Sequence, residues 1–159
     1  MNSLCKLLLA VAAACMSYAA FAQVPQYGTS ITLEQAKKAL IAAEAEAIKN
    51  KWPVAMAIVD NAGQLVAYAR MDNTQTASVQ VSIDKAVSAA TYRRSTKVFQ
   101  DAIAGGGVGV RVLALRGAIP VEGGLVIMQD GKVIGAIGVS GVNSDQDAVV
   151  AKAGVDTVK

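Results

Sequence analysis

"PVEGGLVIMQDGKVIGAIGVSG", residues 120–141, is the stretch that decides the fold. Two aliphatic runs flank Asp130-Gly131, a pair that favours a two-residue type I′ turn between antiparallel strands. The glycines at 135, 138 and 141 recur every three residues, which is not the spacing of a dinucleotide-binding fingerprint. We interpret them as positions where a helix packs closely on a strand, or where the strand bulges, in preference to a ligand contact.

A second hairpin is expected upstream. The runs 54–59 and 65–70 are rich in strand-forming residues and flank a turn that ends at Gly63. A further short strand is expected at 112–115. Because the strands come as hairpins, the sheet should be antiparallel, with helices packed on it.

Four segments are expected to be helical. Residues 32–50 begin with Thr32 and Gln35, which form a capping box. Their apolar row at helical spacing comprises Leu33, Ala36, Leu40, Ala43 and Ala47. The second helix, about 75–91, has an apolar row made of Val79, Ile83, Ala86, Val87 and Ala90. Residues 97–104 form a shorter helix, and the last runs from Asn143 or Ser144 to Val158.

The first 22 residues have the pattern of a secretory signal peptide. One lysine precedes an apolar run from Leu7 to Met16, and Ala20-Phe21-Ala22 follows as a cleavage site. The run is short for a membrane span, which needs about 20 residues. A lipoprotein signal that uses Cys15 is a minor alternative. Cleavage after Ala22 would place the chain in the periplasm or outside the cell, with no membrane segment.

Composition excludes several classes of function. The chain has no histidine, which excludes His-based metal sites, Ser-His-Asp triads and histidine acid–base catalysis. Cleavage after Ala22 would remove both cysteines, Cys5 and Cys15, and with them any thiolate metal site. The formal net charge of +3 is too small to predict nucleic-acid binding.

Few residues suggest chemistry by themselves. The glycines at 105–107 are followed by Val108, without the Lys and Ser/Thr of a phosphate loop, so they predict a flexible loop. Asp60 is explained by its turn and Asp147 by its position at a helix start. Asp72 and Glu122 lie in or near loops, where such local roles are less evident. Lys85 lies off the apolar row of its helix, where most lysines are solvated.

Several short segments, in this order and spacing, carry a family resemblance. They are Arg70-Met71-Asp72, Asp84-Lys85-Ala86 with Ala89-Ala90, Glu122-Gly123-Gly124, and residues 134–141 followed by Gln146-Asp147. Over nearly the whole domain, the chain resembles the GlcG/HbpS-like family, whose domain is often called haem-binding or haem-degrading. The resemblance implies a single α/β (α+β) domain over residues 32–159, after an extended lead-in at 23–31. It implies a profilin/GAF-like sandwich, with a central antiparallel sheet of about five strands flanked by helices.

The resemblance also implies a haem or tetrapyrrole ligand and a homo-oligomer. Without histidine, axial ligation of haem iron would need Met, Tyr, Lys, Thr or no protein ligand. No protein metal site is otherwise expected. The candidate ligand-binding residues are Arg70, Met71, Asp72, Lys85, Tyr92, Glu122, Gly123, Gly124, Ser140 and Gly141. Arg93 and Arg94 are further candidates for pairing with propionates.

Three hypotheses follow. The first is an exported binding protein for haem or a related tetrapyrrole, in redox sensing or haem handling. The second is a small enzyme acting on a hydroxy acid or related carbonyl compound, with Glu122 or Asp72 as acid–base group and Lys85 or Arg70 as carboxylate anchor. The third is a structural or signalling oligomer without a ligand of its own.

Overall fold

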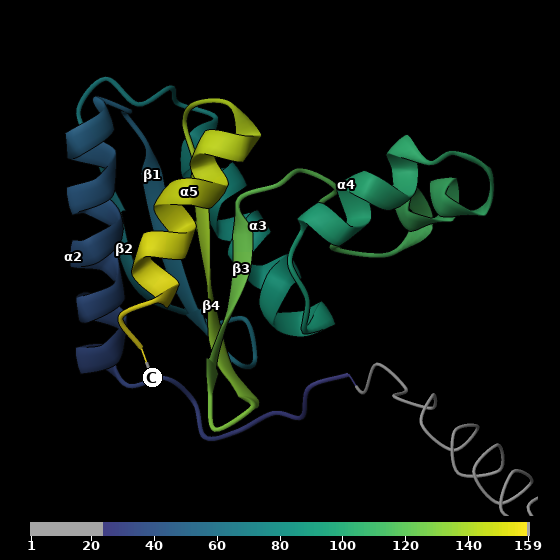
Figure 1. Cartoon of the computed structure of the whole chain (residues 1–159), viewed down its shortest axis with the longest axis horizontal. Coiled ribbons are helices and arrows are strands. Elements are labelled where there is room, and N and C mark those ends of the chain that lie inside the picture. The colour runs from purple at the N-terminus through teal and green to yellow at the C-terminus, as the bar shows by residue number, and fades with distance from the viewer. Residues whose placement is uncertain (1–23, 159) are drawn as a thin grey trace, which may run out of the picture.

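The computed structural model describes residues 24–158. The predicted signal peptide lies outside these residues. Residues 24–158 form one α/β domain with a projecting arm (Figure 1). The elements are α2 (Leu33–Asn50), β1 (Ala55–Asp60), β2 (Leu65–Arg70), α3 (Ser78–Tyr92), α4 (Lys97–Ala104), the 3-10 helix η1 (Gly107–Ala114), β3 (Gly124–Gln129), β4 (Lys132–Ser140) and α5 (Ser144–Val155).

The sheet is antiparallel with strand order β2-β1-β4-β3. Both predicted hairpins are confirmed. Asp130 and Gly131 adopt φ values of 51° and 73°, as a type I′ turn requires at its two central positions. β1 pairs with β4 through the middle of the sheet, which leaves β2 and β3 as the edge strands.

The expected strand count of about five is corrected to four in the described part of the chain. The segment 112–115, expected as a strand, lies in or directly after η1. The reason is local packing against α4. A Cβ on Gly109 would lie 1.9 Å from the Ala102 carbonyl oxygen, so the glycine lets this turn fold back onto α4.

Helices α2 and α5 cover one face of the sheet and α3 covers the other (Figure 1). The capping box of Thr32 and Gln35 is confirmed. α2 turns its alanines inward, and this face consists of Ala36, Ala39, Ala43 and Ala47. Leu33, expected on this row, is instead 52% exposed, because the buried row is shifted around the helix toward Ala39.

α3 turns its small residues toward the sheet, whereas the predicted row of larger ones is only half-buried at Val79, Ile83 and Val87. The cause lies on β4. A Cβ on Gly138 would lie 2.0 Å from the Ser82 carbonyl oxygen and 2.5 Å from the Ala86 nitrogen. The backbones therefore approach so closely that only small side chains fit between them. This confirms the packing interpretation of that glycine.

The arm, which we define as residues 97–121, projects away from the sheet and contains α4 and η1 (Figure 1). Its two ends are held together at its base. The Thr96 N–H donates to the Gly124 carbonyl oxygen at 3.0 Å, and the Gly124 N–H donates to Thr96 Oγ1 at 3.0 Å. No helix within residues 24–158 is both long and apolar enough to cross a membrane.

Candidate functional site

Most of the predicted site residues gather at one end of the sheet. Ala55, at the start of β1, pairs with Arg70 on one side and with Ser140 on the other. Gly124 pairs with Gly138, and the Val139 N–H donates to the Gly123 carbonyl oxygen at 3.0 Å. The predicted residues at this end are Arg70, Met71, Asp72, Glu122, Gly123, Gly124, Ser140 and Gly141.

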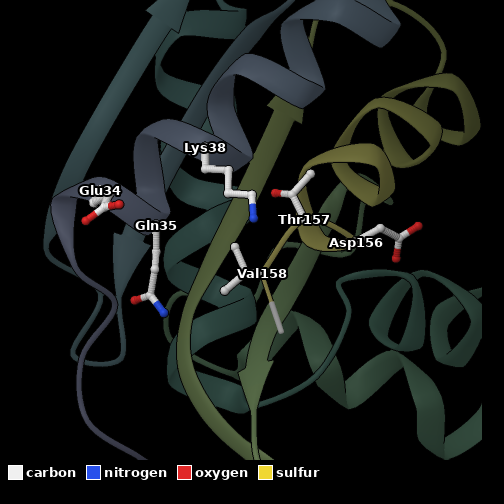
Figure 2. A pocket seen from close by; sticks show the side chains of 6 residues that line it. All are labelled: Glu34, Gln35, Lys38, Asp156, Thr157 and Val158. Atoms are coloured by element: carbon white, nitrogen blue, oxygen red, sulfur yellow. The ribbon is translucent and has the colours of Figure 1, made fainter.

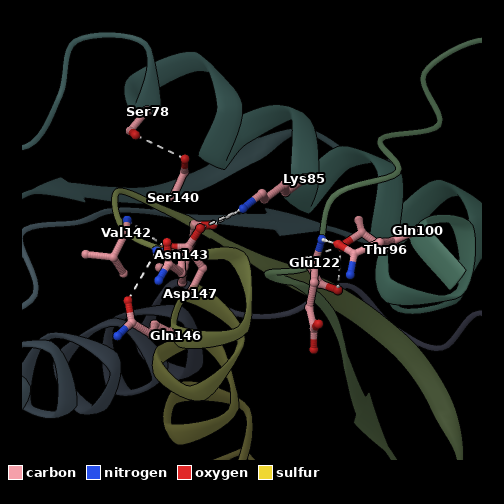
Figure 3. A network of polar contacts seen from close by, with 12 residues as sticks. Ser78, Lys85, Thr96, Gln100, Glu122, Ser140, Val142, Asn143, Gln146 and Asp147 are labelled. Carbon is pink, nitrogen blue, oxygen red and sulfur yellow. Dashed lines mark hydrogen bonds and ion pairs between the residues drawn. The ribbon is translucent and has the colours of Figure 1, made fainter. Parts of the chain in front are cut away.

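Lys85 reaches the same end from α3 and is buried, so it is not one of the solvated lysines (Figure 3). Its ammonium donates to Asp147 Oδ2 at 2.8 Å and to the Val139 carbonyl oxygen at 3.0 Å. Asp147 Oδ1 accepts the Val142 N–H at 3.2 Å. These contacts join α3, the end of β4 and the first turn of α5.

Burial raises the pKa of Asp147 above its ordinary value of 3.8, and the Lys85 ammonium and two backbone N–H groups offset this only in part. The carboxyl is therefore held in a poorly solvated place and depends on its partner. The Lys85 ammonium is buried and already donates to Asp147 and to the Val139 carbonyl oxygen, so it is not open to a ligand in this structure.

Gly123 closes the space above this ion pair. A Cβ there would lie 2.8 Å from Lys85 Nζ, 2.8 Å from the Val139 carbonyl oxygen and 2.9 Å from the Asp147 Cβ. Its φ of +120° is also one that side-chain-bearing residues rarely adopt. The two observations explain why glycine stands at this position. They also show that α3, β4 and α5 pack closely together around it.

Ser140 and Glu122 have different surroundings (Figure 3). Ser140 Oγ donates to Ser78 Oγ at 3.1 Å in a buried contact between β4 and α3. The Glu122 N–H donates to Gln100 Oε1 at 2.9 Å, while its carboxylate points away from Lys85. In one form of the hydroxy-acid hypothesis Glu122 is the acid–base group and Lys85 the carboxylate anchor, and these two side chains do not point toward a common space (Figure 3).

Tyr92 lies apart from the other predicted residues, at the end of α3 and the root of the arm. Its hydroxyl donates to the Arg116 carbonyl oxygen at 2.8 Å. Its ring meets that of Phe99 edge-on, with centroids 5.1 Å apart. Arg94 lies over Phe99, with its guanidinium carbon 5.8 Å from the ring centroid. Tyr92 thus contacts the arm, from the end of α3.

The arm exposes six large apolar side chains. They are Val98, Val108, Val110, Leu113, Leu115 and Val121, with Val108 81% and Leu113 66% exposed. Two exposed arginines, Arg111 and Arg116, lie among them. Exposed apolar surface of this kind marks ligand or protein binding in soluble proteins.

A surface depression of about 520 Å³ lies between α2 and the end of α5 (Figure 2). Its lining is mixed in charge and comprises Glu34, Gln35, Lys38, Asp156, Thr157 and Val158. None of the predicted site residues lines it. Its mixed lining does not define the chemistry of a ligand.

Comparison with known proteins places the chain in a family. Residues 31–156 match the family described as haem degrading protein HbpS-like. The chain belongs to this family. It is 40% identical to protein GlcG of Escherichia coli over 111 residues, which cover 69% of this chain and 81% of GlcG.

HbpS-like structures share the fold. A double mutant of HbpS from Streptomyces reticuli superposes with a TM-score of 0.76 at 27% identity, over 84% of this chain and 90% of that one. The PduOC:haem complex superposes with a TM-score of 0.74, over 82% of this chain and 96% of that one. Its identity of 23% supports the fold alone.

Two features of the HbpS-like domain were missed by sequence reasoning. Asp147 was explained as a helix-start residue, and the exposed apolar side chains of the arm were not considered together. A signal for Asp147 did exist. It shares a helical row with Val150, Ala151 and Gly154, all buried, just as Lys85 shares one with Ser78, Ser82 and Ala89. A charged residue on a row of small or apolar residues indicates that the charge is buried, and a buried charge needs a partner.

Proposed function

We propose that the chain is an exported binding protein for haem or a related tetrapyrrole, and that the arm provides the contact surface. The observation that carries the proposal is the set of exposed valines and leucines on the arm, next to arginines and Tyr92. A tetrapyrrole presents a flat apolar ring and carboxylate edges, which match such a surface. The family description supports the same class of ligand.

Among the side chains that could ligate haem iron, one is suitably placed. The chain contains no histidine, and residues 24–158 hold no group of three or more His, Cys, Asp or Glu side chains that could bind a metal. Met71 packs against the core, whereas Tyr92 is half-buried at the root of the arm. Tyrosine is an established haem ligand. Tyr92 is therefore the residue that would hold the iron, after giving up its hydrogen bond to Arg116.

The propionates would be held by arginines. Arg111 and Arg116 are exposed, and Arg94 is exposed beside Phe99. Arg93 is less suited, because it donates to the Pro25 carbonyl oxygen and lies over the Tyr27 ring at 5.0 Å. Bound haem would supply redox chemistry at its iron; the chain's own residues would orient the ring and neutralise its carboxylates.

Titration with hemin tests the proposal. Wild-type protein should give a saturable shift of the Soret band. Val108→Lys, at a position 81% exposed, should weaken binding about tenfold or more by placing a charge under the ring. Val149→Lys on α5, where the valine is 48% exposed, is the matched control and should behave as wild type. Absence of a saturable shift in the wild type, beside a known haem-binding protein, would refute haem binding; normal binding by Val108→Lys would refute the arm as its place.

Export is part of the same proposal and rests on the sequence of residues 1–22. Intact-mass analysis of the chain recovered from the periplasm should show Gln23 as the first residue and no free thiol. A lipid-modified chain that begins at Cys15 would support the lipoprotein alternative, and an intact chain that keeps both cysteines would contradict export with cleavage. We also propose that the exported chain is a homo-oligomer, as the family resemblance implies.

A further inference from the structure

The outer side of α2 carries a row of large apolar side chains that its own domain leaves uncovered. Leu33, Ile41 and Ile48 are 52%, 67% and 60% exposed. At 100° per residue, the three lie within about 80° of arc, and Lys37 and Glu44 fall between them on the same side. We call these five residues the α2 row. It is distinct from the alanine face that packs on the sheet.

The α2 row is complementary to itself. Leu33 precedes Lys37 by four residues, and Glu44 precedes Ile48 by the same spacing. If two copies of α2 run antiparallel with Leu33 against Ile48, each Lys37 faces the other copy's Glu44, and the two Ile41 side chains meet near the centre. A parallel pair would instead place like charges opposite each other, which is unfavourable.

The edge strand β2 lies on the same side of the molecule as α2 (Figure 1). It carries no charge from Leu65 to Ala69, and Leu65 is 51% exposed. Within residues 24–158, no backbone hydrogen bond joins β2 to a segment other than β1 and its turn. Natural edge strands usually carry charges, proline or a cover that prevents pairing. The other edge differs, since Thr96 hydrogen-bonds to Gly124 at the start of β3.

We infer that the α2 row and the free edge of β2 together bind a second copy of this chain around a two-fold axis perpendicular to the sheet. Such an axis makes the two β2 strands antiparallel and the two α2 helices antiparallel at the same time. If the two β2 strands pair along their full length, Leu65 of each lies opposite the other copy's Arg70, so no like charges meet. The inference specifies the contact surface of the proposed homo-oligomer, and this contact does not depend on bound haem.

Charge exchange within the α2 row tests the inference. The mass of the purified chain in solution is measured by light scattering and native mass spectrometry, over a range of concentrations. Lys37→Glu and Glu44→Lys should each weaken self-association about tenfold or more, because each creates two like-charge contacts. The double variant should restore the wild-type affinity. Lys37 is exposed and Glu44 half-buried on the helix surface, and circular dichroism checks that each variant folds.

A second pair of variants separates this surface from the arm. Ile41→Lys should weaken self-association and leave hemin titration unchanged, whereas Val149→Lys, the matched helix-surface control, should change neither. A wild-type chain that is monomeric at all concentrations would overturn the inference. So would a double charge exchange that fails to restore association, or an Ile41→Lys variant with wild-type mass. These outcomes leave haem binding on the arm unaffected, so the two proposals fail separately.

Discussion

The Lys85 ammonium on α3 lies 2.8 Å from the Asp147 carboxylate on α5, and the two side chains are only 1% and 3% exposed. The residues are 62 positions apart and come from helices on opposite faces of the sheet. The pair depends on Gly123 lacking a Cβ, which would lie 2.8 Å from Lys85 Nζ and 2.9 Å from the Asp147 Cβ. The pair therefore ties together both layers of the sandwich at the end where most predicted site residues lie.

Removing one partner of this pair should cost more stability than removing both. Lys85→Met alone leaves the Asp147 carboxylate buried without its cation, and should lower the free energy of unfolding by about 3–5 kcal/mol. Adding Asp147→Leu should recover part of that loss, because no uncompensated charge remains. Urea denaturation of the four proteins of the double-mutant cycle measures the coupling. Additive losses in the double variant would show that the two charges do not depend on each other.

The pH dependence of stability should reflect the raised pKa of Asp147. Because the folded chain binds this proton more tightly than the unfolded chain, the stabilising contribution of the group is complete below 3.8 and declines as pH rises through the folded-state pKa. Asp147→Asn lacks this titration. Denaturation at a series of pH values should therefore show wild type losing stability relative to Asp147→Asn across that window. The opposite slope would mean that Lys85 holds the pKa of Asp147 below its ordinary value.

Gly138 should tolerate no side chain. In Gly138→Ala the new Cβ would meet the Ser82 carbonyl oxygen at 2.0 Å, so α3 must move away from β4. We expect a loss of about 1–3 kcal/mol or more in the free energy of unfolding, as for other overpacked sites. Gly105→Ala is the control, because its nearest contacts would be 3.5 and 3.6 Å away and its φ is −72°. Equal stability of the two variants would contradict the close approach of α3.

Tyr92→Phe should separate iron ligation from binding of the ring. The variant keeps the edge-on contact with Phe99 but lacks the phenolic oxygen. Hemin should still bind, with the tyrosinate-to-iron charge-transfer absorption absent from the ferric spectrum. Tyr27→Phe is the matched control, since the Tyr27 hydroxyl only donates to backbone oxygens of α3. An unchanged ferric spectrum in Tyr92→Phe would exclude this residue as the ligand.

Local signals in the sequence predicted most of the elements. The Asp130-Gly131 turn and the Thr32–Gln35 capping box depend on neighbours within a few residues, so their conformations could be predicted without knowing the rest of the chain. The strand expected at 112–115 was wrong because its aliphatic residues suit a strand as well as a helical turn, and the deciding contact, Gly109 against Ala102, is made with another element.

The sequence predicted part of the candidate site, and missed the part that depends on contacts between distant segments. The family motifs brought Arg70, Gly123, Ser140 and Lys85 into consideration, and the structure places them at one end of the sheet. Asp147 was set aside because its position at a helix start already explained it. Its partner lies 62 residues away, and helical spacing alone does not show which rows of two helices will meet.

The sequence by itself determined the two hairpins and their antiparallel pairing, because turn geometry and side-chain alternation depend on neighbouring residues. It also determined the absence of histidine chemistry, because this follows from composition alone. Only the tertiary structure decided which face of α3 is buried, where the arm points and that Lys85 meets Asp147. These outcomes depend on close contacts between distant segments. Gly138 lets the small face of α3 reach β4, and this places Lys85 inside the domain rather than in water.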